Sequence, residues 1–110
     1  MPISLHVKPA AEKTGKRFTA IFRIHKGGKV IKITNFGQRN PKKGTYIDHG
    51  NKQLRAAYRA RHKKDLETND YKRAGYLSWH ILWGDKTNLI DAVKDYKKRF
   101  KLDWLFMYLF

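Results

Sequence analysis

Residues 17–36, RFTAIFRIHKGGKVIKITNF, carry the strongest secondary-structure pattern in the chain. A period of two in hydrophobicity predicts a strand over residues 17–25 with one apolar face. Two glycines lie within residues 26–29, where a tight turn between antiparallel strands needs backbone freedom. Residues 30–36 are rich in β-branched side chains and form the expected return strand. The predicted apolar face of the first strand consists of Phe18, Ala20, Phe22 and Ile24.

A shorter strand is predicted before this hairpin. Apolar and polar residues alternate over residues 3–7, and Pro9 ends the pattern. Together the segments predict a small antiparallel sheet of two or three strands. Residues 45–47 are expected to be briefly extended within an otherwise irregular loop.

Three helices are expected after the sheet. The first is expected to begin after a cap at Asp48 or Asn51 and to end near residue 64. The second is expected over residues 71–83. The third is expected to begin after a cap at Thr87 or Asn88 and to end near residue 100. Residues 65–70 read as a polar break between the first two. This order of elements predicts an α+β fold, with a single domain over residues 1–102 followed by an apolar C-terminal tail over residues 103–110.

The helical periodicity also predicts which faces are buried. In the first helix, Leu54, Ala57 and Tyr58 form the expected apolar side, and the opposite side is almost wholly cationic. The second helix is expected to bury Tyr76, Trp79, Leu82 and Trp83. The third is expected to bury Leu89, Val93, Tyr96 and Phe100.

The net charge is the feature that limits function most. The 110 residues hold 25 Lys and Arg against 9 Asp and Glu, a net charge of +16. Counting along the sequence, residues 1–64 contribute 17 basic and 2 acidic residues (+15), and residues 65–110 contribute 8 and 7 (+1). Such asymmetry indicates an acidic partner, either nucleic acid or an acidic protein surface.

A set of basic residues in the first 64 positions forms the expected binding face for a polyanion or an acidic surface. Tyr46 and Tyr58 lie among them and could stack on bases. No zinc finger, homeodomain or RNA-recognition motif accompanies them. The basic set is Arg17, Arg23, Arg39, Lys42, Lys43, Lys52, Arg55, Arg59, Lys63 and Lys64.

The last seven residues, 104–110, are all apolar or aromatic. Two interpretations stay open: the segment folds back onto the sheet of its own chain, or it inserts into a neighbouring subunit. Insertion into a lipid surface is a third. The residues expected to dock are Trp104, Leu105, Phe106, Tyr108 and Phe110.

Enzymatic chemistry finds little support in the sequence. The chain has no cysteine, and its five histidines match no metal-ligand or metalloprotease spacing. The basic half offers only Glu12 and Asp48 to a metal-dependent nuclease, and these are far apart in sequence. The segment around His49 is expected to be a turn and helix cap. We therefore predict no catalytic residue, no metal and no cofactor.

Several short motifs resemble a family of small basic proteins encoded by large double-stranded DNA viruses, the nucleocytoplasmic large DNA viruses. The likeness is colinear over residues 17–102, with Arg55 and Tyr58 included. The linker at residues 65–75 departs from the pattern, and the chain continues past Leu102. The motifs are FGQR (36–39), TYIDHG (45–50), RHKK (61–64), LSWHILWG (77–84) and YKKRF (96–100).

This resemblance implies a non-enzymatic minor structural protein of the virion that bridges capsid subunits through its basic face and aromatic tail. The implied partners are capsid proteins with acidic surfaces and an apolar groove. The implied location is the virion, with the host cytoplasm or nucleus during assembly. The alternative is a sequence-independent nucleic-acid-binding protein that packages viral DNA. No apolar run is long enough to span a bilayer, and peripheral contact with an internal membrane stays open.

Overall fold

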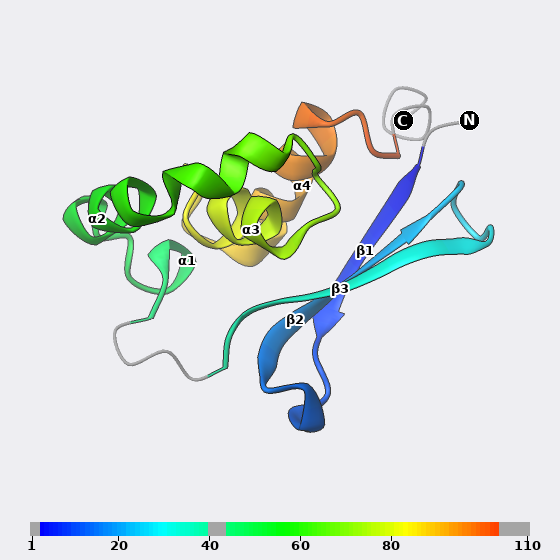
Figure 1. The fold of residues 1–110 in the computed structure, drawn as a ribbon, viewed down its shortest axis with the longest axis horizontal. Coiled ribbons are helices and arrows are strands. Elements are labelled where there is room, and N and C mark those ends of the chain that lie inside the picture. Colours follow the sequence, from blue (N-terminus) through cyan, green and yellow to red (C-terminus); the bar gives the residue numbers. More distant parts are fainter. Residues whose placement is uncertain (1–2, 40–43, 104–110) are drawn as a thin grey trace.

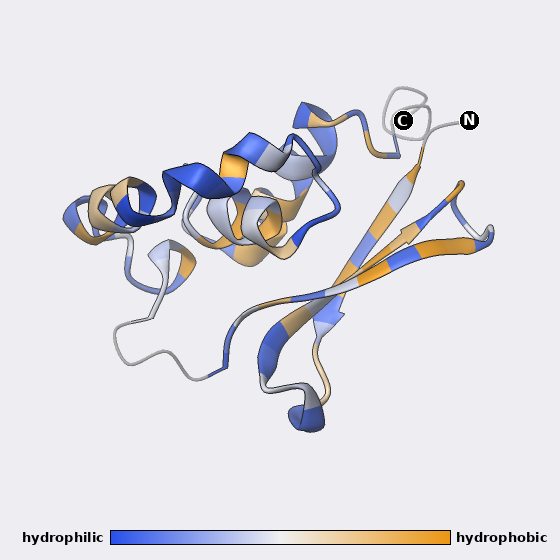
Figure 2. Ribbon diagram, in the orientation of Figure 1, coloured by the Kyte–Doolittle hydropathy of each residue, from blue (hydrophilic) through white to orange (hydrophobic). Residues whose placement is uncertain are grey.

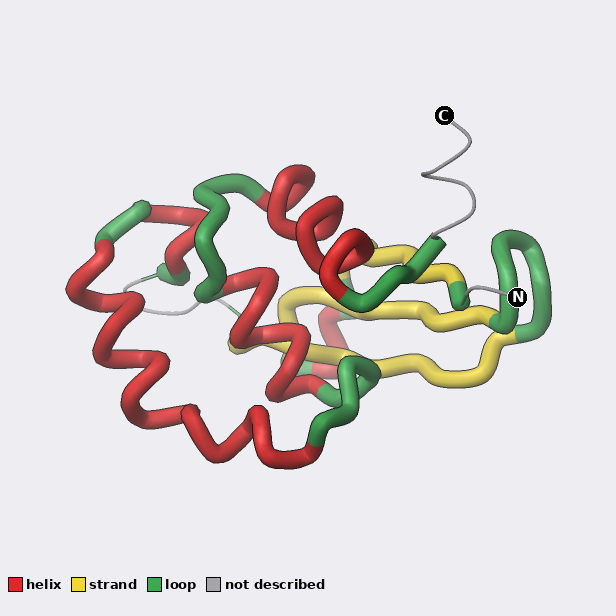
Figure 3. Tube along the Cα trace, turned by 90° about the horizontal axis from the view of Figure 1, so that it is seen from above, coloured by secondary structure: helices red, strands yellow, loops and turns green. Residues whose placement is uncertain are grey.

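The computed structural model describes residues 3–39 and 44–103, and it confirms the predicted α+β class. Strands β1 (Ser4–Pro9), β2 (Lys16–Arg23) and β3 (Val30–Gln38) form one antiparallel sheet in that order. A 3-10 turn, η1 (Glu12–Thr14), joins the first two strands. The helical segments lie together on one side of the sheet, as Figures 1 and 3 show from two directions. The predicted tail at residues 104–110, with its docking residues, lies outside the described residues.

The helical part contains six segments. The predicted helices correspond to α2 (Lys52–His62), to α3 (Ala74–Leu77) together with η3 (Ser78–Leu82), and to α4 (Leu89–Arg99). Two further stretches were not predicted as helical: α1 (Tyr46–His49), and the part of the 3-10 helix η2 (Lys63–Thr68) that follows residue 64. The expected extended segment at 45–47 and the polar break at 65–70 were therefore wrong.

One face of the sheet forms the core with α3, η3 and α4. Phe18, Ala20 and Phe22 are buried on it, as predicted, but Ile24 is 42% exposed because the hairpin continues beyond the helices. The full core cluster comprises Leu5, Phe18, Ala20, Phe22, Phe36, Leu77, Ile81, Leu82, Ala92, Tyr96 and Leu102.

The second helix buries Tyr76 and Leu82, as predicted, but not its two tryptophans. Leu77 and Ile81 are fully buried in their place, whereas Trp79 and Trp83 are only half-buried. The reason is that η3 is a π-helical turn, closed by the Trp83 N–H donating to the Ser78 carbonyl at 3.1 Å. The wider turn rotates the helix face away from the 3.6-residue period.

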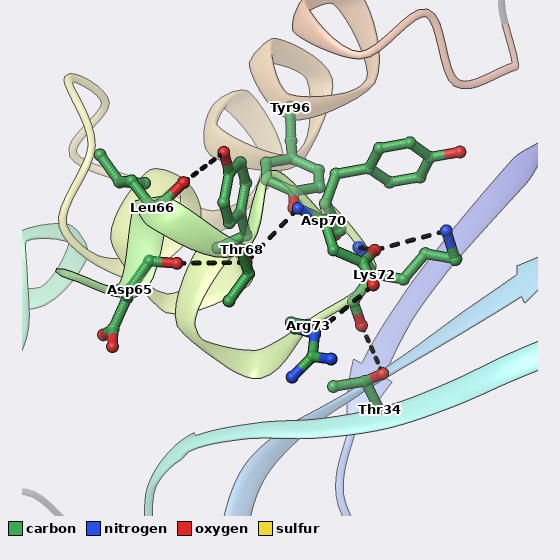
Figure 4. A network of polar contacts seen from close by, with 10 residues as sticks. Thr34, Asp65, Leu66, Thr68, Asp70, Lys72, Arg73 and Tyr96 are labelled. Carbon is green, nitrogen blue, oxygen red and sulfur yellow. Dashed lines mark hydrogen bonds and ion pairs between the residues drawn. The ribbon is translucent and has the colours of Figure 1, made fainter. Parts of the chain in front are cut away.

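Polar contacts fix the connection between η2 and α3 over the core (Figure 4). The Thr34 hydroxyl donates to the Lys72 carbonyl at 2.6 Å, which ties the connection to β3. The Tyr76 hydroxyl donates to the Leu66 carbonyl at 3.0 Å, and the Tyr96 hydroxyl donates to the Tyr71 carbonyl. Buried hydroxyls need such partners, so this connection is a fixed part of the fold.

The end of α4 is also anchored to the sheet. Leu102 is buried in the core, and the Asp103 N–H donates to the Ile3 carbonyl at 2.9 Å. The Asp103 carboxylate pairs with Lys97 at 2.9 Å. Among the described residues, no helix is long and apolar enough to cross a membrane.

His80 makes stability depend on pH. Its ring lies among the rings of Tyr76, Tyr96 and Phe100, with centroids 5.5–5.9 Å away. Burial, followed by the nearby Arg99 and Arg59, lowers the pKa of His80 from 6.5 to about 4. The unfolded chain therefore takes up the proton first, and stability falls as pH drops from 6.5 towards 4.

We expect the wild-type protein to lose about 1 kcal/mol more stability than His80→Gln between pH 7.5 and 4.5, after discounting for the partial exposure of the ring. Urea unfolding at the two pH values measures this difference. Equal losses of unfolding free energy in the wild-type protein and in His80→Gln would contradict the burial of His80 as a neutral imidazole.

Candidate nucleic-acid interface

Helix α2, with the start of η2 that follows it, carries four exposed cations. Its start is capped by Asn51, whose side-chain oxygen accepts from the N–H groups of Gln53 (2.9 Å) and Leu54 (3.1 Å). Asn51 was one of the two predicted caps. This cap fixes where the helix begins, and thereby the orientation of every side chain on it.

Arg55 and Arg59 of α2 bind to the protein itself. The prediction that they belong to a solvent-facing cationic side of the helix was therefore wrong. Arg55 donates to the Gly84 carbonyl and to the Asp85 carboxylate, both at 3.2 Å. The Arg59 Nε donates to the Trp83 carbonyl at 3.1 Å. A guanidinium at the end of a long side chain can serve such carbonyls where a shorter polar residue could not.

Both arginines also lie over aromatic rings. The Arg55 guanidinium is 4.6 Å from the centre of the Tyr46 ring, and that of Arg59 is 5.5 Å from the Trp79 ring. Tyr46 is buried, so it is not available to stack on a base. Because Leu54 is only half-buried and Ala57 is exposed, the helix is held mainly by the arginines and an aromatic stack.

Tyr58 is the centre of that stack. Its ring lies 4.6 Å from Trp83, at an interplanar angle of 7°, and 4.2 Å from His62, at 22°. Burial, followed by the nearby Asp65 carboxylate, raises the pKa of Tyr58 to about 12. The hydroxyl therefore stays protonated at physiological pH.

The exposed cations of this region are Lys52, Arg61, Lys63 and Lys64. None of them takes part in the ion pairs found among residues 3–39 and 44–103. Arg61 was not in the predicted set, because its helical spacing placed its stem on the apolar side with Leu54 and Tyr58, yet the residue is exposed. Lys52 and Arg61 belong to α2, and Lys63 and Lys64 begin η2. These four residues, which we call the α2 cation row, present positive charge that no described carboxylate neutralises.

A cavity of about 700 Å³ lies beside this row, between α2 and the end of β3. Phe36, Leu54 and Leu82 give it apolar walls, and Tyr58 and Trp83 give it aromatic ones. Lys16, Arg61 and the carboxylate of Asp65 also line it. The cavity thus combines apolar and aromatic walls with two cations and one carboxylate.

Two other predicted binding residues have internal partners. Arg17 makes a bidentate contact with Asp48, at 2.7 and 2.8 Å. The hydrogen bonds from Arg17 hold the pKa of Asp48 well below its usual range, and Asp48 also completes the capping box of α1 with Thr45. Arg39 lies 3.7 Å from Glu12 and reaches the carbonyls of Ala10 and Lys16.

The remaining predicted residues are scattered. Arg23 is half-buried on the sheet, on the face that no helix covers. Lys42 and Lys43 lie outside the described residues. Of the eight predicted basic residues that the structure describes, Lys52, Lys63 and Lys64 are the exposed ones without an ion-pair partner.

The segment at His49 is a turn and cap, as expected. The Asn51 N–H donates to His49 Nδ1 at 2.8 Å, and Gly50 takes a left-handed conformation with φ of 64°. His49 Nε2 is buried without a hydrogen-bond partner among the described residues and packs beside the Trp83 ring. Within the same residues, no cluster of three His, Asp or Glu side chains could hold a metal ion.

Fold and site together define a small α+β protein with a basic, arginine-anchored helix. Residues 6–62, slightly more than half of the chain, match the model of a family of unknown function, DUF5754, and the chain belongs to this family. The match runs from within β1 to the end of α2 and includes Lys52 and Arg61 of the cation row, whereas Lys63 and Lys64 follow it. Neither the curated proteins nor the solved structures contain a match.

Proposed function

We propose that the protein is a non-enzymatic nucleic-acid-binding protein that holds the phosphate backbone without reading sequence. The observation that carries this proposal is the α2 cation row. Its charges have no described carboxylate partner, whereas the neighbouring Arg55 and Arg59 are bound to the protein itself. Unpaired Lys and Arg side chains gain affinity by displacing counterions from phosphates.

The cavity beside the row supports the same function. Lys16 and Arg61 line it and can contact phosphates. Its aromatic wall offers no open face of Tyr58, because Trp83 and His62 cover both sides of that ring. The cavity therefore supports contact with the backbone and not stacking of bases.

We expect binding of a fluorescein-labelled random-sequence duplex to weaken steeply with salt. If the four cations of the row each meet one phosphate, the slope of log K against log salt concentration is about −3.6. Fluorescence anisotropy over a series of NaCl concentrations measures it. Undetectable binding, or binding that does not change with salt, would contradict the proposal.

A second candidate is a minor capsid-associated protein of a large DNA virus, located in the virion and in the host cytoplasm or nucleus during assembly. The observation that favours it is an exposed apolar hairpin at the opposite end of the molecule from α2 (Figure 1). Two distant binding surfaces suit a protein that bridges neighbours. The protein should then co-purify with intact particles at a fixed ratio, and deletion of residues 103–110 should release it. Absence from purified particles would refute this candidate.

A further inference from the structure

The hairpin between β2 and β3 extends beyond the helical layer. Its turn closes with the Gly28 N–H donating to the His25 carbonyl at 2.9 Å, and with the Ile24 N–H donating to the Lys29 carbonyl at 3.0 Å. Figures 1 and 3 both show this turn at the far end of the molecule from α2. The hairpin can therefore meet a partner without any movement of the core.

Large aliphatic side chains are exposed on this hairpin. Ile24, Val30, Ile31 and Ile33 are 37–57% exposed, and Figure 2 shows the hydrophobic colour along the extended part of the strands. Among the described residues, the remaining large exposed hydrophobic side chain is Ile90 on α4. Single exposed side chains are ordinary, but four on one hairpin are not. Ile24 continues the core-side face of β2 and Ile33 pairs with Ile21 on the opposite face, so aliphatic side chains lie on both faces of the extended hairpin.

Basic residues alternate with these aliphatic ones. Arg23, Lys29 and Lys32 flank them, and none of the three forms an ion pair with a described carboxylate. No acidic residue occurs anywhere in residues 13–47. The surface is thus aliphatic and uniformly positive.

We propose that this hairpin inserts into the surface of an anionic lipid bilayer. Isolated aliphatic side chains can enter the boundary between head groups and acyl chains, while the lysines beside them reach lipid phosphates and carboxylates. A narrow, extended hairpin has the shape for such shallow insertion. This contact is separate from the α2 cation row and does not depend on the proposed nucleic-acid binding.

Other occupants fit the surface less well. A second copy of the chain would bring like charges together. Nucleic acid would find little to stack on, because Phe18, Phe22 and Phe36 face the core and the ring at the turn is the small imidazole of His25. An acidic polypeptide shares the charge but, being extended and hydrated, offers no apolar layer for four aliphatic side chains.

The chain contains no cysteine, so one introduced cysteine can carry an environment-sensitive fluorophore at a single position. We compare Ile31→Cys with Ile90→Cys, both labelled with nitrobenzoxadiazole, in the full-length protein. The probes are phosphatidylcholine vesicles with and without phosphatidylserine, and poly-L-glutamate. Both positions are exposed, so neither label disturbs the core, and circular dichroism verifies the fold.

With phosphatidylserine vesicles, emission from the label at position 31 should rise about twofold and shift to the blue, while the label at position 90 stays near its value in buffer. Lys29→Gln and Lys32→Gln should each weaken vesicle binding about fivefold. Equal responses at both positions would overturn the proposal, because the protein would then adsorb by charge alone. A response at position 31 to poly-L-glutamate, or to protein concentration without lipid, would overturn it in favour of a protein partner.

Discussion

Gly84→Ala is expected to destabilise the protein by about 3 kcal/mol, the upper part of the range for overpacking a closed site. A Cβ atom at this position would lie 2.2 Å from the backbone carbonyl oxygen of His80. That oxygen belongs to the π-helical turn η3 and cannot rotate away as a side chain could. Urea unfolding followed by circular dichroism measures the change.

Gly28→Ala is the matched control for that variant. Neither glycine has a positive φ, so alanine introduces no backbone strain at either position. At Gly28 the new Cβ would meet only the imidazole of His25, at 2.8 Å, and this ring can move into solvent. A loss below about 1 kcal/mol is expected here, and equal losses in the two variants would contradict the role of the carbonyl.

The double variant Arg55→Gln/Arg59→Gln should lose about 2–3 kcal/mol of stability. Each change removes charge-assisted hydrogen bonds to the segment at residues 83–85 and a contact with an aromatic ring. Since α2 buries no residue completely, little else compensates. The loss of free energy in urea unfolding should be accompanied by faster proteolysis within α2.

A charge-conserving control separates geometry from electrostatics. Arg55→Lys/Arg59→Lys keeps the net charge but replaces two planar guanidinium groups by ammonium groups. An ammonium group cannot reproduce the guanidinium geometry that lets Arg55 bond to the Gly84 carbonyl and to Asp85 together. Most of the destabilisation should therefore remain. Full recovery of stability by lysine would show that charge alone holds the helix.

The sheet could be predicted from the sequence because its pattern is local. Alternation over residues 17–36 defines both strands, and the paired glycines define the turn between them. The start of α2 was equally local, since the Asn51 side chain caps backbone groups only two and three residues away. Such short-range signals need no knowledge of tertiary contacts.

The errors have tertiary causes. Residues 45–47 were expected to be extended, but Asp48 joins a capping box and is held by Arg17, which is 31 positions earlier. Trp79 and Trp83 were expected on the buried face of α3 and η3, but the π-helical turn leaves the 3.6-residue period and they are only half-buried. Neither effect can be read from hydrophobic periodicity.

The candidate nucleic-acid interface could be predicted only in part, again because tertiary contacts decide which cations are free. A sequence count treats every arginine and lysine of α2 as solvent-facing charge. In the structure, Arg55 and Arg59 lie on the same face as Tyr58 and bond to the segment at residues 83–85, and the lysines stay outside. Arg55 and Arg59 are four residues apart, with Tyr58 between them, and this spacing could have indicated a shared face. It could not show that the two side chains bond to the carbonyls of residues 83 and 84.

The exposed lysines after α2 are expected to bind phosphates, whereas Arg55 and Arg59 hold the helix to the protein, and one measurement tests this difference most directly. Salt-dependent duplex binding is compared for Lys63→Gln/Lys64→Gln and for Arg55→Gln/Arg59→Gln, which remove the same amount of charge. At a temperature where both variants are folded, the lysine variant should show a salt slope smaller in magnitude by about 2, because each removed cation no longer meets a phosphate. The arginine variant should keep the wild-type slope. Equal slopes in the two variants, or a loss confined to the arginine variant, would contradict the account.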